Sequence, residues 1–143
     1  MSMEVQVTDL ASGVSVGVNR DGALKVGAAQ ASKTFNATLE VDDTPVEIVP
    51  AKGGEIFCIT GILLTGNKGI STNTDATVSI YTSTDSASST AVTTILTTLV
   101  AQSSSRDILL GTNFLAAEEG HFINGQTSDD NVVVTVMGFY VKV

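Results

Sequence analysis

From residue 33 to the C-terminus, short runs of apolar and β-branched residues alternate with turn-forming residues about every 8–12 positions. Thr34–Val41 is typical of these runs, because apolar residues occupy every second position and polar residues fill the positions between them. A period of two places the apolar side chains on one face of an extended strand. The pattern therefore predicts a half-buried β-strand, and the same reasoning applies along the rest of this region.

Further strands are expected after each group of turn residues. We predict them at Val46–Val49, Ile56–Leu64, Thr77–Tyr81, Ala91–Ala101, Arg106–Leu110, Asn113–Ala116, His121–Ile123 and Val132–Val143. Ile56–Leu64 is apolar on both faces, which is typical of a central strand. Gly138 inside the last run indicates a bulge or a close backbone approach, and Asn124–Asn131 is expected to be a polar loop. The pattern gives about eight strands, and no segment has the length and sustained period of a helix. We therefore predict an all-β fold for residues 33–143, a two-sheet jelly-roll-like β-sandwich.

Ala91–Ala101 is the one run whose apolar positions permit either secondary structure. Val92, Ile95, Leu96 and Leu99 recur at helical spacing. The many threonines lower the helix propensity of the run and favour a strand. We therefore predict a strand, with a helix as the open alternative.

Residues 1–32 differ from the rest of the chain. Short β-like runs at Glu4–Thr8, Val14–Val18 and Ala23–Val26 surround an Asp21-Gly22 turn, which predicts a β-hairpin. The segment has too few large apolar residues to form its own core. We expect either an N-terminal hairpin or extended arm that packs on another subunit, or a ribbon that folds back on its own sandwich.

Composition narrows the classes of partner. The chain has 15 acidic and 7 basic residues, a net charge of −8, and its basic residues are scattered singly. This disfavours nucleic acid and anionic membranes as partners. Only 15% of residues are charged while 43% are hydrophobic, so the surface relies on Ser, Thr, Asn and Gly, which suits a subunit of an assembly.

The cysteine content and the N-terminus bear on the compartment. A single cysteine, Cys58, cannot form an internal disulfide and is most simply a small buried hydrophobe. The N-terminus shows no basic patch followed by an apolar segment, and no apolar run reaches the roughly 18–20 residues that span a bilayer. We therefore expect synthesis in a cytoplasm.

Residues that could support chemistry are sparse. His121 is the only imidazole, and no serine lies in a nucleophile-elbow motif. The adjacent carboxylates Asp42-Asp43, Glu118-Glu119 and Asp129-Asp130 are expected in solvated turns, because neighbouring residues do not form a facing catalytic pair. One cysteine and one histidine cannot fill a tetrahedral metal site. We predict no catalytic, cofactor-binding or metal-binding residues, and no enzymatic activity.

Three segments resemble small β-sandwich virion proteins of tailed bacteriophages. They are Asn19–Val26, the stretch Val49–Leu64, and the C-terminal pattern Leu115…Glu118-Glu119-Gly120…Val132–Val141. The resemblance implies a jelly-roll-like subunit without catalytic residues. It further implies an oligomer, often a trimer, on the outside of a capsid or in the tail apparatus.

The sequence as a whole leads to a structural function. We expect a capsid decoration or cement protein that is assembled in the host cytoplasm, forms a homotrimer and binds the major capsid protein on the capsid exterior. Residues Met1–Ala31 would anchor it to capsomers or to a neighbouring subunit. The alternatives are a tail, fibre or adaptor protein, or a carbohydrate-binding module. The absence of Trp argues against the last of these, which would use Tyr81 or Tyr140.

Overall fold

The computed structural model describes residues 6–9, 14–18, 24–25, 32–39, 44–67, 75–110, 113–129 and 132–143. Among these residues the regular structure consists of β-strands throughout. This part of the chain therefore contains no helix that is long and apolar enough to cross a membrane. The predicted all-β class is confirmed.

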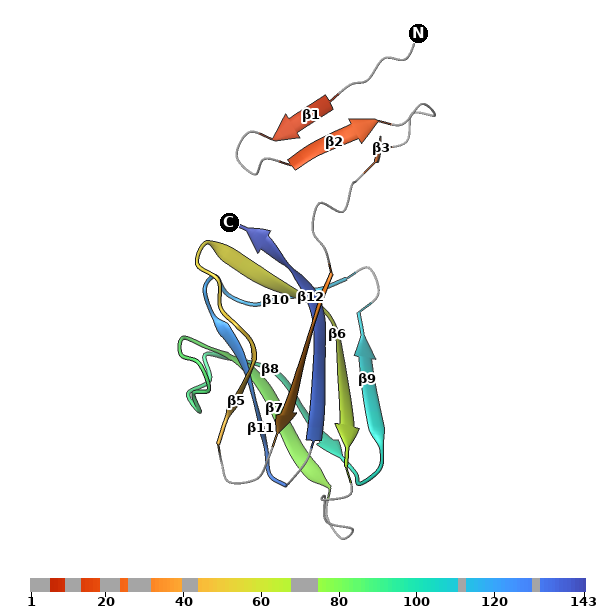
Figure 1. The fold of residues 1–143 in the computed structure, drawn as a ribbon, viewed down its shortest axis with the longest axis vertical. Coiled ribbons are helices and arrows are strands. Elements are labelled where there is room, and N and C mark those ends of the chain that lie inside the picture. Colours follow the sequence, from red (N-terminus) through yellow and green to blue (C-terminus); the bar gives the residue numbers. More distant parts are fainter. Residues whose placement is uncertain are drawn as a thin grey trace.

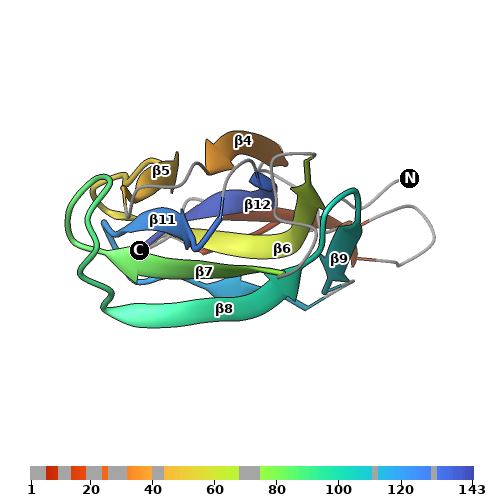
Figure 2. The same ribbon diagram turned by 90° about the horizontal axis from the view of Figure 1, so that it is seen from below.

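Two antiparallel sheets pack face to face (Figures 1 and 2). The first contains β4 (Lys33–Leu39), β12 (Val132–Lys142), β6 (Glu55–Gly66), β9 (Ser105–Leu109) and β10 (Leu115–Ala116). The second contains β5 (Val46–Val49), β11 (Phe122–Thr127), β7 (Ala76–Ser83) and β8 (Thr93–Val100). Both β9 and β10 pair with β6 along the edge that β12 leaves open. They act together as one interrupted edge strand.

The strand order identifies the sandwich as a jelly roll. The sheets run β4-β12-β6-β9/β10 and β5-β11-β7-β8. Apart from the β7–β8 hairpin and the break between β9 and β10, each connection from β4 to β12 crosses from one sheet to the other. Interleaving of this kind produces the two Greek keys of a jelly roll. The predicted two-sheet sandwich is therefore confirmed.

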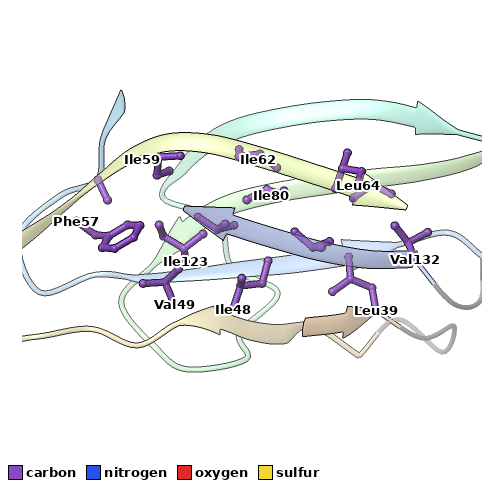
Figure 3. Close-up of a cluster of buried hydrophobic side chains, with 14 of the residues drawn as sticks. Leu39, Ile48, Val49, Phe57, Ile59, Ile62, Leu64, Ile80, Ile123 and Val132 are labelled. Carbon is purple, nitrogen blue, oxygen red and sulfur yellow. The ribbon is translucent and has the colours of Figure 1, made fainter. Parts of the chain in front are cut away.

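The core lies between the sheets and is built from alternate residues of each strand. Figure 3 shows ten of its side chains labelled, and Ile59, Ile80, Ile123 and Val132 among them are fully buried. At one end the rings of Phe57 and Tyr140 meet edge to face, with centroids 4.9 Å apart. Alternation brings one face of every central strand into this layer, as the period of two predicts.

The ambiguous run Ala91–Ala101 forms a strand. β8 spans Thr93–Val100 and pairs with β7 along its whole length. Val100 is fully buried, whereas Thr94 and Thr97 are exposed. The threonine-rich composition therefore decided the outcome in favour of a strand, as expected.

The prediction of a polar loop at Asn124–Asn131 is wrong over its first half. β11 continues to Thr127, and Asn124 is fully buried within it. The Asn124 amide is satisfied there, because Oδ1 accepts from the Ala87 amide (3.3 Å) and Nδ2 donates to the Asp85 carbonyl (3.0 Å). A polar residue with all its groups paired can occupy a central strand, which sequence periodicity does not reveal.

The N-terminal region forms a separate three-stranded antiparallel sheet. Its strands are β1 (Gln6–Asp9), β2 (Val14–Val18) and β3 (Leu24–Lys25), in that order. Figure 1 shows this small sheet beyond the end of the sandwich at which β12 finishes. The predicted strands are thus present, while the Asp21-Gly22 turn lies outside the described residues. The division into an arm of residues 1–32 and a domain of residues 33–143 stays a prediction.

The close backbone approach expected at Gly138 is present, and the bulge beside it is on the partner strand, where Thr60 of β6 has no partner on β12. The register between β12 and β6 shifts between Met137 and Gly138. A Cβ at position 138 would lie 2.1 Å from the Cys58 carbonyl oxygen and 2.8 Å from the ring of Phe57. Only glycine allows the two backbones to approach this closely.

We predict that Gly138→Ala lowers the free energy of unfolding by about 3 kcal/mol, because the clash involves backbone and the strands must separate. Urea denaturation followed by circular dichroism measures the loss. Gly53→Ala is the matched control, since a Cβ there has no neighbour within 4 Å. Equal effects of the two substitutions would contradict the close-approach explanation.

Candidate functional site

The outer face of the first sheet is apolar over one part of β6 and β12 and polar over the rest, where Thr38, Thr65 and Thr135 lie. Cross-strand partners lie on the same face of a sheet, and the register pairs Met137 with Gly61, Phe139 with Cys58 and Val141 with Ile56. We call the apolar part the apolar outer face. Its apolar side chains are Ile56, Cys58, Leu63, Leu109, Val133, Met137, Phe139 and Val141, together with Phe114 beside Phe139.

Side chains of the apolar outer face touch one another, and all of them except the buried Cys58 are at least partly exposed. A Cβ at Gly61 would lie 2.7 Å from Cε of Met137 and 3.1 Å from Cδ2 of Leu109, so these two side chains meet above Gly61. The rings of Phe114 and Phe139 pack edge to face at 5.9 Å. Leu109 is 69% exposed and Phe114 52% exposed. A contiguous exposed apolar surface of this kind is typical of an interaction site.

The outer face of the second sheet is polar instead. Thr77, Ser79, Gln126 and Ser128 line a shallow depression there. Ser79 Oγ lies 3.5 Å from Thr97 Oγ1 on the neighbouring strand. Leu99 is the large exposed hydrophobe of this face, 49% exposed. The expected Ser/Thr-rich surface is present on this sheet and extends to Thr34, Thr38 and Thr135 of the first sheet, whose apolar part lies around Met137 and Phe139.

The apolar residues on both faces of Ile56–Leu64 are visible in the sequence, but the sequence does not show that one of these faces lies on the outside of the sandwich. Ile56–Leu64 was expected to be central because both its faces are apolar, and β6 is indeed flanked by β12 on one edge and by β9 and β10 on the other. Only one of its faces meets the second sheet, however. The other face belongs to the exposed surface.

Glu118, one of the predicted turn carboxylates, gathers three donors. Its Oε2 accepts from Thr82 Oγ1 (2.8 Å) and lies 2.7 Å from Nδ1 of His121, while its Oε1 accepts from Thr93 Oγ1 (2.7 Å). A carboxylate can only accept, so His121 donates from Nδ1. The hydrogen bonds from Thr93 and Thr82, and then His121, lower the pKa of Glu118 below its usual value.

The cluster holds the segment before β11 against β7 and β8, because the two threonines belong to those strands. Glu118 was expected to be a solvated turn residue, and that expectation is wrong in part: its side chain is 45% exposed but fully engaged. The threonine partners lie 25 and 36 residues away in the chain. Such distant pairing left no signal in the local sequence.

The other residues singled out in the sequence lie apart from one another. Cys58 is buried, as predicted, and burial raises the pKa of its thiol. Asp42, Asp43 and Asp130 lie outside the described residues. Over the described part of the chain, no three His, Cys, Asp or Glu side chains come together in a group that could hold a metal ion.

Both tyrosines considered for carbohydrate stacking are buried. Tyr81 is 3% exposed, and its hydroxyl donates to the Ser88 carbonyl (2.8 Å). The Tyr140 hydroxyl donates to the Pro50 carbonyl (2.6 Å), and its ring packs against Phe57. Burial, with smaller contributions from Glu55 and Glu47, raises the pKa of Tyr140 to about 12. Neither ring can serve as a stacking platform, which removes the basis for a carbohydrate-binding module.

Comparisons with known proteins assign no family. No family model matches the sequence, and no curated protein matches it. A solved structure from work on Bacillus endospore appendages, described as disulfide-linked pili, is 14% identical. It aligns over 80% of this chain and 88% of that chain with a TM-score of 0.47. The assignment of the jelly roll rests on strand order rather than on this likeness.

We predict that Glu118→Gln destabilises the protein by about 1 kcal/mol at pH 7, the value of hydrogen bonds to a charged acceptor after allowance for solvent exposure. Because the folded-state pKa of Glu118 is lowered, its contribution is present above the ordinary value of 4.5 and is lost as the pH falls through the lower folded value. The difference between variant and wild type should therefore shrink in acid. Urea titrations from pH 7 to about pH 3 measure it.

Glu119→Gln serves as the control for this comparison, since Glu119 is its exposed neighbour in the same turn. It should follow the wild-type stability at every pH. A constant difference between wild type and Glu118→Gln across the acid range would show that the Glu118 charge does not stabilise the turn.

Proposed function

We propose that this protein is a non-enzymatic structural subunit of a tailed-phage virion, a capsid decoration or cement protein that acts as an oligomer on the capsid exterior. The observation that carries the proposal is the contrast between the two outer faces of the sandwich. One is apolar around Leu63, Met137 and Phe139, and the other is polar around Ser79 and Thr97. A subunit that buries one face in an assembly and shows the other to water needs this contrast.

The charge of the chain supports an exterior position. A net charge of −8 per subunit is repelled by packaged DNA and is tolerated on a surface that faces solvent. The resemblance of Val49–Leu64 and Val132–Val141 to phage virion proteins supports the choice of a phage particle over other assemblies. A homotrimer that contacts the major capsid protein remains the proposed state.

We predict that deleting residues 1–32 abolishes binding to capsids while the sandwich stays folded, because those residues form the proposed anchor. Co-sedimentation with purified particles measures binding, and circular dichroism measures folding. The full-length chain is the control. If the shortened chain still binds capsids, the N-terminal segment is not the anchor.

Location and oligomeric state are tested on the intact protein. Light scattering at micromolar concentration should give three times the 14.7 kDa mass of the chain, and antibody labelling of virions should decorate the head. A monomer both in solution and on particles would overturn the oligomer. Label confined to the tail would instead favour a tail, fibre or adaptor protein.

A further inference from the structure

The edge of the second sheet at β8 carries neither charge nor proline. Among the described residues β8 pairs with β7 alone, and Figure 2 shows it at the margin of the sheet. Every residue from Ser86 to Ser105 is uncharged, and none is proline. Charged side chains and prolines are the usual means by which an edge strand avoids pairing with another chain. The backbone groups on the open side of β8 are therefore available to a further strand.

The other edge strands of the sandwich differ from β8 in length or in charge. β10 spans two residues and β5 spans four. A short strand offers few backbone groups, and a charged side chain disfavours pairing with another strand. The charged residues of these edges are Lys33 on β4, Glu47 on β5, and Arg106 and Asp107 on β9. β8 is the edge best suited to receive a strand.

The backbone groups of Thr97 and Leu99 point to the open side of β8. On β7 the Thr77 amide donates to Ser128 Oγ (2.8 Å), and the Thr77 carbonyl accepts from the Ser128 amide (2.9 Å). The backbone of Thr77 thus faces the β11 side, although Thr77 lies opposite Leu99 of β8. In an antiparallel ladder such a pair exchanges no hydrogen bonds, so the groups of Leu99 point away from β7. The same holds two residues along, where Ser79 lies opposite Thr97.

A bulge limits the part of β8 that can accept a strand. Ile95 has no partner on β7, because the register shifts beside it. From Leu96 to Val100 the pairing is regular. Since a bulge bends its strand and interrupts the ladder, a further strand can pair regularly only along Leu96–Val100, which has Thr98 at its middle.

We propose that β8 of one copy pairs antiparallel with β8 of a second copy, about a two-fold axis at Thr98. Thr97 of each copy then lies opposite Leu99 of the other, and the two Thr98 residues lie opposite each other. The outward amides and carbonyls of Thr97 and Leu99 form two hydrogen-bonded pairs, one on each side of the Thr98 pair. The joined sheets form one continuous sheet across the two copies.

Neighbouring registers use the edge less well. An axis at Thr97 would bring Leu99 opposite the bulged Ile95. An axis at Leu99 would bring Thr97 opposite Ala101, whose carbonyl already accepts from the Ser104 amide (3.3 Å). An axis between two residues would set inward side chains opposite outward ones. The bulge and the turn after β8 thus fix the register at Thr98.

The same register matches the side chains of the two copies. Leu99 is 49% exposed on the outer face of the sheet, and Thr97 of the second copy covers part of it. On the inner face the half-buried Leu96 lies opposite the buried Val100. Because Leu96 already packs against the core, the pairing extends both cores toward each other.

Charge favours a second copy as the occupant of this edge. Two copies that each carry −8 repel each other over most of their surfaces. Ser86–Ser105 is the longest uncharged stretch in the chain, so two copies approach each other there with the least repulsion. The edge is also its own complement, because a two-fold axis exchanges Thr97 and Leu99.

The size of the contact sets its strength. At about 3.4 Å per residue the paired edge is about 17 Å long. So short an edge buries less than the roughly 800 Å² per partner of a stable complex, and the contact is weak by itself. It goes beyond the proposed trimer, because it joins subunits in pairs, and it gains strength where many subunits lie side by side on one surface.

Disulfide trapping in the full-length chain tests the register. Thr98→Cys places two thiols opposite each other at the axis, where the Cα atoms lie about 4.5 Å apart, within reach of a disulfide. Thr97→Cys is the matched control, because its two copies are offset along the strands and lie about 8.5 Å apart, too far for a disulfide. With oxidised glutathione as oxidant, Thr98→Cys should form the covalent dimer at least about tenfold faster. Non-reducing electrophoresis measures the dimer.

Exposure works against this expectation and makes the comparison demanding. Thr97 is exposed whereas Thr98 is half-buried, so random collision would favour Thr97→Cys. The wild-type chain, whose single Cys58 is buried, measures the background. Equal rates for the two variants, or a faster reaction of Thr97→Cys, would overturn the proposal.

A second test removes one backbone donor from the open side of the edge. Thr97→Pro, introduced into the Thr98→Cys chain, deletes an amide that points away from β7, so the ladder with β7 is kept. Thr97→Ala in the same chain is the control, since it retains the amide. Cross-linking should fall at least about tenfold with proline and persist with alanine. Circular dichroism checks folding, and undiminished cross-linking of a folded proline variant would contradict the backbone pairing.

The outcomes separate this contact from the proposed function. A wild-type oligomer on particles, without preferential cross-linking of Thr98→Cys, contradicts only the β8 contact. Preferential cross-linking of a protein that is absent from particles contradicts the proposed function and supports the contact. Loss of capsid binding by Thr97→Pro without a Thr98→Cys dimer would assign the edge to a strand of a capsid protein and overturn the pairing of two copies.

Discussion

The antiparallel pairing of β6 with β12 organises both the core and the outer surface of the first sheet. The two strands run side by side from Glu55–Lys142 to Gly66–Val132, the most extensive pairing in the described chain. Their inner residues, such as Ile59 and Val134, form the centre of the core. Their outer residues form the apolar outer face. A change in register by one residue would exchange the two sets, so this pairing decides which residues are buried and which are exposed.

The register of that pairing shifts by one residue beside Gly138, because Thr60 of β6 has no partner on β12. Beyond this shift Phe139 shares the outer face with Cys58, while Tyr140 turns inward against Phe57 and reaches the Pro50 carbonyl. The aromatic end of the core and the aromatic part of the outer face thus both depend on one glycine. Fold and candidate interface share the same backbone feature.

Polar contacts hold the connecting segments of the sandwich in place. Asn124 fixes the loop between β7 and β8 through backbone groups of Asp85 and Ala87. Glu118 fixes the segment before β11 through Thr82 and Thr93. In both cases the hydrogen bonds of one side chain join segments that are far apart in the sequence.

Local patterns were sufficient to predict the strands, because a period of two and turn residues are properties of neighbouring positions. Thr34–Val41 and Ala91–Ala101 were predicted as strands from their own residues, and Gly138 as a point of close backbone approach. The exception, Asn124, depends on partners about 37 residues away. Only the tertiary structure decided which apolar face of β6 and β12 enters the core, and that Glu118 meets two distant threonines. These outcomes depend on pairing between remote segments, and no local pattern of side chains specifies which remote partner a strand or a carboxylate will meet.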